Sequence, residues 1–115
     1  MEINDRQADR LSRAFHALSD PTRRAILARL VTGEASVSEL MEPFDLSQPT
    51  ISKHLKVLES AGLIEGGREA QRRPRRLAPL ALKSIADWIE PFRQQWEGRF
   101  NQLEIHLAKM KRQEK

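Results

Sequence analysis

The sequence predicts a mostly α-helical fold with one small β-hairpin. Apolar residues recur at helical spacing through most of the 115 residues, and glycines and prolines separate the helical segments. Residues 63–77 instead contain short apolar runs around a glycine pair, which is typical of a hairpin. A chain of this length with 39% hydrophobic residues can bury one modest core. We therefore expect a single domain over residues 1–115, with five to six helices.

Two amphipathic helices are expected before Gly33. The first covers about residues 5–18 and has one apolar stripe. The residues of this stripe are Ala8, Leu11, Ala14, Phe15 and Leu18. Ser19, Asp20 and Pro21 then supply a break, an N-cap and a first helical residue, so a second helix begins there and ends before Gly33.

The next two helices have the spacing of a helix-turn-helix. Ser36 and Glu39 match a capping box, which begins a short third helix that stops near Pro43. Only residues 42–46 separate this helix from the following one, so the two helices must cross at a steep angle. The helix-turn-helix is therefore expected over residues 36–61.

The second of these helices, residues 48–61, has the properties of a DNA-reading helix. Ser47 is a good N-cap, Pro49 suits the first turn, and Gly62 stands where a left-handed C-cap residue belongs. One face carries an apolar stripe, and the opposite face is polar and contains no acidic residue. The stripe consists of Ile51, Leu55 and Leu58, and the polar face of Pro49, Ser52, Lys53 and Lys56.

This polar face predicts particular DNA contacts. Gln48 can pair with adenine, Lys53 can reach guanine, and Pro49 can contact only an apolar group such as a thymine methyl. We expect base readout by Gln48, Pro49, Thr50, Ser52 and Lys53. We expect DNA backbone contacts from Ser47, His54, Lys56, Arg68, Arg72, Arg73, Arg75 and Arg76. His54 lies at the edge of the anchoring stripe, so internal packing is an equally good alternative for it.

The arginine-rich hairpin at residues 63–77 is interpreted as a wing. Residues 68–76 contain five arginines and one acid, which suits neutralisation of DNA phosphates. Pro74 cannot donate a ladder hydrogen bond, so it should lie at an edge or near the turn. The alternative is a solvated basic loop without a DNA contact.

The C-terminal part predicts two further helices and a dimer. Pro91 should interrupt the helical pattern, with a boundary or kink at Glu90. Because so small a domain has difficulty covering both terminal stripes, we expect residues 1–18 and 79–112 to dimerise. The expected interface residues are Leu11, Phe15, Trp88, Phe92, Trp96, Phe100, Leu103 and Leu107. The alternative is that both stripes pack within the monomer.

Composition excludes several other classes of protein. The net charge of +4 and pI near 10.0 favour a polyanionic partner, and the absence of cysteine excludes disulfides and thiolate sites. We expect no secretory leader, no membrane span and a cytoplasmic location. No catalytic constellation is evident, so no enzyme, cofactor or metal is expected. A less favoured metal site between subunits would use Asp87, Glu90, Glu104 and His106.

Three segments resemble the ArsR family of winged helix-turn-helix regulators. They are Ala-Leu-Ser-Asp-Pro-Thr-Arg-Arg-Ala-Ile-Leu at residues 17–27, Leu-Ser-Gln-Pro-Thr-Ile-Ser-Lys-His-Leu-Lys-Val-Leu at 46–58, and Ala-Gly-Leu-Ile at 61–64. The resemblance implies a homodimeric repressor on an inverted-repeat operator, released by a small-molecule or protein inducer. Metal-sensing relatives carry a Cys-Val-Cys motif where this chain has Ser36 and Ser38. The chain is thus similar to a cysteine-free subgroup that mostly does not sense metals.

The sequence therefore predicts a sequence-specific, DNA-binding transcriptional regulator. Two other classes stay open at this point. One is an architectural protein that binds DNA without sequence preference. The other is a protein-interaction adaptor that uses the aromatic C-terminal helix while the wing is merely solvated.

Overall fold

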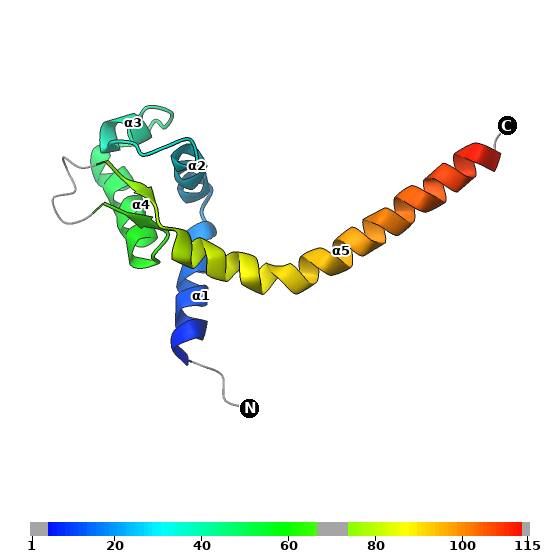
Figure 1. Ribbon diagram of the computed structural model, residues 1–115. Helices are drawn as coiled ribbons and strands as arrows, with labels where there is room; N and C mark the ends of the chain where they lie inside the picture. Colours follow the sequence, from blue (N-terminus) through cyan, green and yellow to red (C-terminus); the bar gives the residue numbers. More distant parts are fainter. Residues whose placement is uncertain (1–4, 67–73, 114–115) are drawn as a thin grey trace. The chain divides into compact units, whose positions relative to one another are not determined.

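The computed structural model describes residues 5–66 and 74–113. Within them lie five helices and one antiparallel pair of strands (Figure 1). The elements are α1 (Asp5–Leu18), α2 (Pro21–Leu30), α3 (Val37–Met41), α4 (Gln48–Ser60), β1 (Ile64–Glu65), β2 (Arg76–Leu77) and α5 (Pro79–Gln113). The chain divides into two compact units, residues 1–85 and 86–115. The mostly helical fold with a small hairpin is confirmed.

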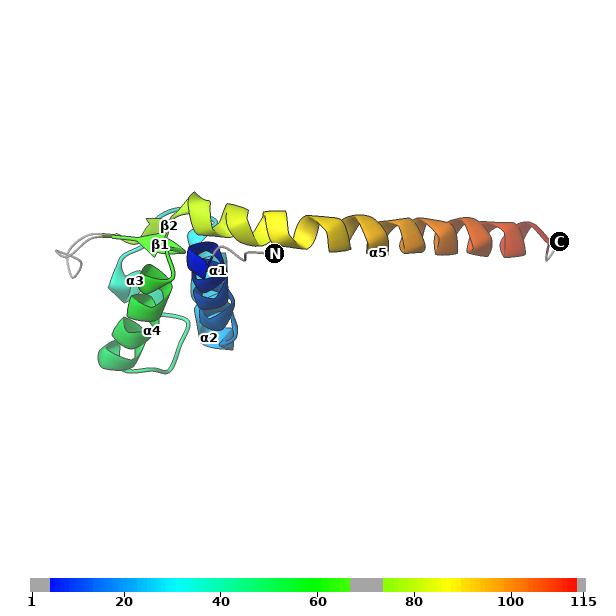
Figure 2. The ribbon, with the colours of Figure 1, turned by 90° about the horizontal axis from the view of Figure 1, so that it is seen from below.

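The core of the first unit lies where α1, α2, α3 and α4 meet. Figure 2 shows α1, α2 and α4 side by side, and each of these three helices contacts the other two. The predicted anchoring stripe of α4 forms the centre, because its three side chains are completely or almost completely buried. The largest fully buried side chains are Ile26, Leu40, Ile51, Leu55, Leu58 and Leu63. Burial of such side chains stabilises a fold by roughly 1.5–3 kcal/mol each.

Helix α4 begins and ends with the residues that the sequence indicates. The Ser47 hydroxyl accepts a hydrogen bond from the amide of Thr50 at 3.4 Å. At the other end Gly62 has φ of 73°, in the left-handed region that favours glycine. The amide of Leu63 donates to the carbonyl of Leu58 at 3.0 Å, and the amide of Gly62 to that of Glu59 at 2.9 Å. These two bonds form a Schellman motif, which turns the chain from α4 into β1.

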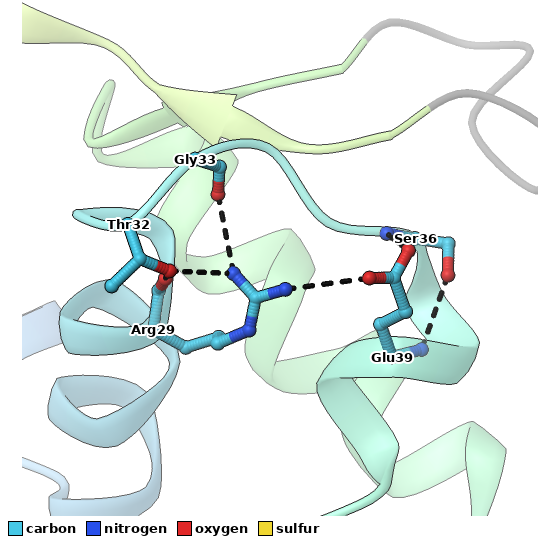
Figure 3. Close-up of polar contacts among 5 residues, drawn as sticks. All are labelled: Arg29, Thr32, Gly33, Ser36 and Glu39. Carbon is cyan, nitrogen blue, oxygen red and sulfur yellow. Dashed lines mark hydrogen bonds and ion pairs between the residues drawn. The ribbon is translucent and has the colours of Figure 1, made fainter.

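The connection between α2 and α3 is held by polar contacts (Figure 3). The Ser36 hydroxyl accepts from the Glu39 amide at 3.1 Å, and the Glu39 carboxylate accepts from the Ser36 amide at 3.2 Å. This confirms the predicted capping box. Arg29 near the end of α2 donates to Thr32 Oγ1 at 3.0 Å and to the Glu39 carboxylate at 3.3 Å. The start of α3 is therefore tied to the last turn of α2.

The base of the wing contains more pairing than the two named strands. Ile64 pairs with Leu77 and Glu65 with Arg76 in antiparallel register. Ala35, in the connection before α3, also exchanges two backbone hydrogen bonds with Arg75, at 3.0 and 2.8 Å. The helix-turn-helix and the wing base are thus joined through main-chain bonds. Residues 67–73, which include the predicted wing contacts Arg68, Arg72 and Arg73, lie outside the described residues.

Of the boundary or kink expected at Glu90, the boundary is wrong, because α5 continues through Pro91. A proline inside a helix removes a hydrogen bond and costs about 3 kcal/mol. Side-chain contacts at helical spacing stabilise the turns around it. Arg93 donates to both carboxylate oxygens of Glu90 at 2.6 and 2.9 Å, and the rings of Trp88 and Phe92 lie 4.8 Å apart. These contacts help to offset the cost of the proline.

We predict that helix capping makes stability depend on pH. Hydrogen bonds from the Arg23 amide to Asp20 and from the Ser36 amide to Glu39 lower the pKa of each carboxyl. A lowered folded-state pKa contributes stability that is present above the unfolded pKa, near 4, and is lost as pH falls through the folded value. In urea unfolding at pH 7 and pH 3, the wild type should therefore lose more stability on acidification than Asp20→Asn with Glu39→Gln.

The matched control is Glu42→Gln with Asp45→Asn, which removes two charges from the loop between α3 and α4. This control should keep the wild-type dependence on pH. Identical pH profiles for the wild type and the capping variant would contradict the assignment.

Candidate nucleic-acid interface

Helix α4 presents an exposed polar face opposite its buried stripe. Gln48, Pro49, Ser52, Lys53 and Lys56 are all exposed, and residues 47–58 contain no acidic side chain. The face is therefore cationic and carries groups that can donate to or accept from base edges. Its position is fixed, because Ile51, Leu55 and Leu58 on the opposite side are in the core.

The first turn of α4 contains a local hydroxyl pair. Ser47 Oγ and Thr50 Oγ1 are hydrogen-bonded at 2.9 Å, and Ser47 also accepts from the Thr50 amide. Ser47 is exposed and Thr50 is half-buried. The Ser47 hydroxyl is therefore the N-cap of α4, and the Thr50 hydroxyl is hydrogen-bonded to it.

His54 points toward the protein rather than toward the exposed face. The Arg23 guanidinium lies 3.3 Å from its Nδ1, and an Asp20 carboxylate oxygen lies 3.9 Å from the same atom. Only 19% of the His54 side chain is exposed. This placement favours internal packing, the alternative that the sequence left open, and the expected backbone contact by His54 stays a prediction.

Arg75 is also placed differently from the expectation. Its exposed fraction is 6%, and its Nε donates to the Glu59 carboxylate at 2.7 Å. A Cβ added at Gly66 would overlap the Arg75 side chain, so Gly66 leaves the space through which the guanidinium passes. Arg75 therefore joins the wing base to the end of α4. This placement favours a structural role, and the expected DNA contact by Arg75 stays a prediction.

Arg76 lies on the surface of the wing base. Its Nε donates to the Glu65 carboxylate at 2.9 Å, and this hydrogen bond raises the pKa of the guanidinium. The side chains of Arg76 and Glu65 are 65% and 51% exposed. An exposed ion pair of this kind is worth about 0–1 kcal/mol, so a phosphate can replace the carboxylate at little cost.

Comparisons with known proteins identify the family. A helix-turn-helix domain profile matches residues 18–66. The chain is 40% identical over 80 residues to an HTH-type transcriptional regulator of Mycobacterium tuberculosis, covering 70% of this chain and 75% of that protein. It is 35% identical over 82 residues to the transcriptional repressor SdpR of Bacillus subtilis, covering 71% of this chain and 91% of that protein.

Solved structures similar to this chain agree with these sequence relatives. A crystal structure of an ArsR family transcriptional regulator is 35% identical, covers 84% of this chain and 97% of its own, and has a TM-score of 0.68. The chain belongs to the ArsR family. A solution structure of a homodimeric winged helix-turn-helix DNA-binding domain from Mycobacterium bovis, a possible ArsR-family regulator, is 26% identical and has a TM-score of 0.60. It covers 82% of this chain and 91% of its own. ArsR-family proteins are transcriptional regulators and not enzymes, as the sequence predicts.

In this ArsR-family member, the segment before α4 has a structural role. Ser36 caps α3, and Ser38 is exposed on it. The chain has no cysteine. In the described part of the chain, no three His, Asp or Glu side chains are grouped so that they could hold a metal ion.

Two buried arginines were not recognised as structural from the sequence. Arg23 precedes Ile26, Leu27 and Leu30 at helical spacing, so its position on the buried face of α2 could have been predicted. The sequence around Arg75 does not distinguish it from the other arginines of the wing segment, so its burial could not be predicted. Its role depends on Glu59, which is distant in sequence.

We predict that Gly66→Ala destabilises the protein by displacing Arg75. Loss of the 2.7 Å bond leaves a buried charged donor without its carboxylate, which costs roughly 1.5–3 kcal/mol. The urea midpoint should fall accordingly. Gly98→Ala is the control, because its added Cβ meets no atom within 4 Å and alanine favours a helix. An unchanged urea midpoint for Gly66→Ala would refute the role of Gly66 in leaving space for the Arg75 side chain.

Proposed function

We propose that the chain is a homodimeric repressor that reads an inverted-repeat operator with α4. The observation that carries this proposal is the exposed, acid-free face of α4 above a buried apolar stripe. A helix held in this way can enter the major groove while its opposite side remains in the core. The Bacillus subtilis and Xylella fastidiosa relatives are named repressors, which supports repression as the mode of regulation.

Base readout is assigned to the first two turns of α4. Gln48 and Lys53 supply the side chains suited to adenine and to guanine. The members of this group are Gln48, Pro49, Thr50, Ser52 and Lys53. Their number and chemistry suit recognition of a defined sequence better than uniform binding to DNA.

Backbone contacts are assigned to the flanking cations and hydroxyls. Lys56 is exposed on the same helix, and Ser47 is exposed at its start. Arg76 is exposed at the wing base, and the sequence assigns Arg68, Arg72 and Arg73 to the same task. His54 and Arg75 are left out, because they are occupied inside the protein.

Dimerisation is assigned to the terminal helices, residues 1–18 and 79–112. In the second unit, α5 carries large apolar side chains that are between 44% and 60% exposed in the single chain. They are Trp88, Phe92, Trp96, Phe100, Leu103, Ile105, Leu107 and Met110. Leu11 and Phe15 on α1 are partly exposed. A second copy would remove this surface from water, as in the homodimeric Mycobacterium bovis relative.

The proposed site of action is the cytoplasm, where the operator lies. No helix in the described residues is long and apolar enough to cross a membrane. The release signal is proposed to be something other than a metal bound by thiolates, since the chain has no cysteine.

Selection of bound duplexes from a random DNA pool tests this function. A symmetric dimer should enrich an inverted repeat whose half-sites lie about 10 base pairs apart, or a multiple of that distance. Enrichment of a single half-site would contradict the dimer. No enrichment, with equal affinity for all duplexes, would indicate an architectural protein.

We predict that Gln48→Ala with Lys53→Ala weakens binding to the selected operator by at least tenfold. The loss on a random duplex should be smaller, because base contacts distinguish the two and each good contact is worth about 1–3 kcal/mol. Fluorescence anisotropy on both duplexes measures the difference. Lys109→Ala with Gln113→Ala removes the same side-chain types from α5 and should change neither affinity. Equal losses on both duplexes would refute base readout by this face.

We also predict that Arg72→Ala with Arg73→Ala flattens the dependence of affinity on salt. Each lost phosphate contact lowers the slope of log K against log salt by about 0.9, so two contacts lower it by about 2. Titrations between 50 and 200 mM salt measure this slope. Arg99→Ala with Arg112→Ala removes two arginines from α5 and serves as the control. If the wing variant keeps the wild-type slope, these arginines do not contact phosphate.

A further inference from the structure

A groove lies between α1 and α4, and among its lining residues only Lys56 is a proposed DNA contact. Its volume is about 480 Å³. Arg13 and His16 come from α1, and Lys56, Val57 and Ala61 from α4. The groove therefore lies along the recognition helix, beginning one turn after the residues assigned to base readout.

The size of the groove suits a small molecule. Ligand sites typically have volumes of about 300–1,000 Å³, whereas a protein partner covers about 800 Å² of surface on each side. Most of the exposed lining is apolar. The aliphatic side chains of Val57 and Ala61 supply part of this surface, which suits a hydrocarbon body.

The charged groups of the groove have one sign. Two cations and a histidine line it, and no acidic residue does. Among the described residues, the Arg13 guanidinium and the Lys56 ammonium have no hydrogen bond or ion pair with another side chain. By contrast, Arg23, Arg29 and Arg75 all donate to protein acceptors. The unpartnered cations around an apolar floor are complementary to an anion with an apolar body.

We propose that this groove binds a small amphipathic carboxylate and that its occupation weakens DNA binding. The carboxylate lies between Arg13, His16 and Lys56, and the hydrocarbon body contacts Val57 and Ala61. Lys56 carries the coupling, since its ammonium is assigned to a phosphate and is drawn toward the ligand instead. A ligand that competes for Lys56 must lower the affinity for DNA, and DNA must lower the affinity for the ligand. This regulatory step rests on the proposed function, whereas ligand binding itself does not.

A second groove is the weaker candidate. It has a volume of about 380 Å³ and is lined by Leu11 and Leu80 beside Arg13. Leu11 belongs to the proposed dimer interface, so a second copy of the chain would cover this groove in the dimer. Only the first groove is assigned to the ligand.

The binding test uses the full chain without DNA and decanoate as the probe. In ¹H–¹⁵N NMR spectra, decanoate should shift the amide signals of Arg13, His16, Val57 and Ala61 in a saturable way. Decanamide has the same chain length without the charge, and it should bind at least tenfold more weakly. Equal affinities for the two probes would overturn the anionic class. Shifts confined to the apolar residues of α5 would overturn the assigned groove.

The variant test uses Arg13→Gln with His16→Gln, two residues outside the proposed DNA contacts. Decanoate affinity should fall at least tenfold. Arg99→Gln with His106→Gln is the matched control, because it removes an arginine and a histidine from α5. This control should bind decanoate as the wild type does. Circular dichroism and the urea midpoint establish that both variants are folded, and equal decanoate binding by both would overturn the proposal.

The regulatory test adds the selected operator. Saturating decanoate should lower the operator affinity of the wild type by about fivefold or more, within the usual range of coupling between sites. It should have no effect on Arg13→Gln with His16→Gln, whose operator affinity without ligand should equal that of the wild type. If this variant instead loses DNA affinity and no decanoate binds, the groove is part of the DNA interface and the proposal is overturned. A failure to bind any operator would refute the proposed function while leaving the NMR result valid.

Discussion

The position of α4, the proposed recognition helix, depends on the buried guanidinium of Arg23. Its Nε donates to the carbonyl of Ala17 at 2.7 Å and one amino group to that of His16 at 3.1 Å. Its other amino group lies 3.3 Å from His54 on α4. Arg23 therefore binds two carbonyls in the last turn of α1, lies in the first turn of α2 and contacts α4. A buried cation without such acceptors would be strongly destabilising, so the three helices can meet only where all of these partners are within reach.

This constraint divides the surface of α4. Because His54 is turned toward Arg23, the cations that remain outside are Lys53 and Lys56, which face away from the core. The same cluster holds the end of α1 against α4, and the groove between these helices begins there with His16 and Lys56. The proposed DNA-reading face and the proposed ligand groove are thus neighbouring surfaces of one helix. Lys56 belongs to both surfaces, so a ligand that binds Lys56 would compete directly with DNA.

The sequence predicted those features that depend on neighbours along the chain. The capping box, the Ser47 N-cap and the Gly62 C-cap follow from short-range backbone chemistry, and the buried stripe of α4 follows from helical period. Features that depend on distant residues were missed. Arg75 is indistinguishable from other wing arginines until Glu59 and Gly66 are placed beside it. Pro91 is a different case, because the contacts that help to offset its cost, such as Arg93 with Glu90, are local.

The capping box also bears on where a signal can act. Ser36 and Ser38 stand where the family resemblance leads one to expect the cysteines of metal-sensing relatives, so this chain has no thiolate at those positions. Here Ser36 and Glu39 satisfy each other's backbone amides, and Arg29 ties Glu39 to α2 (Figure 3). These groups are committed to holding α3 in place. The groove beside α1 is the site proposed for a ligand instead, because it combines unpartnered cations with apolar surface.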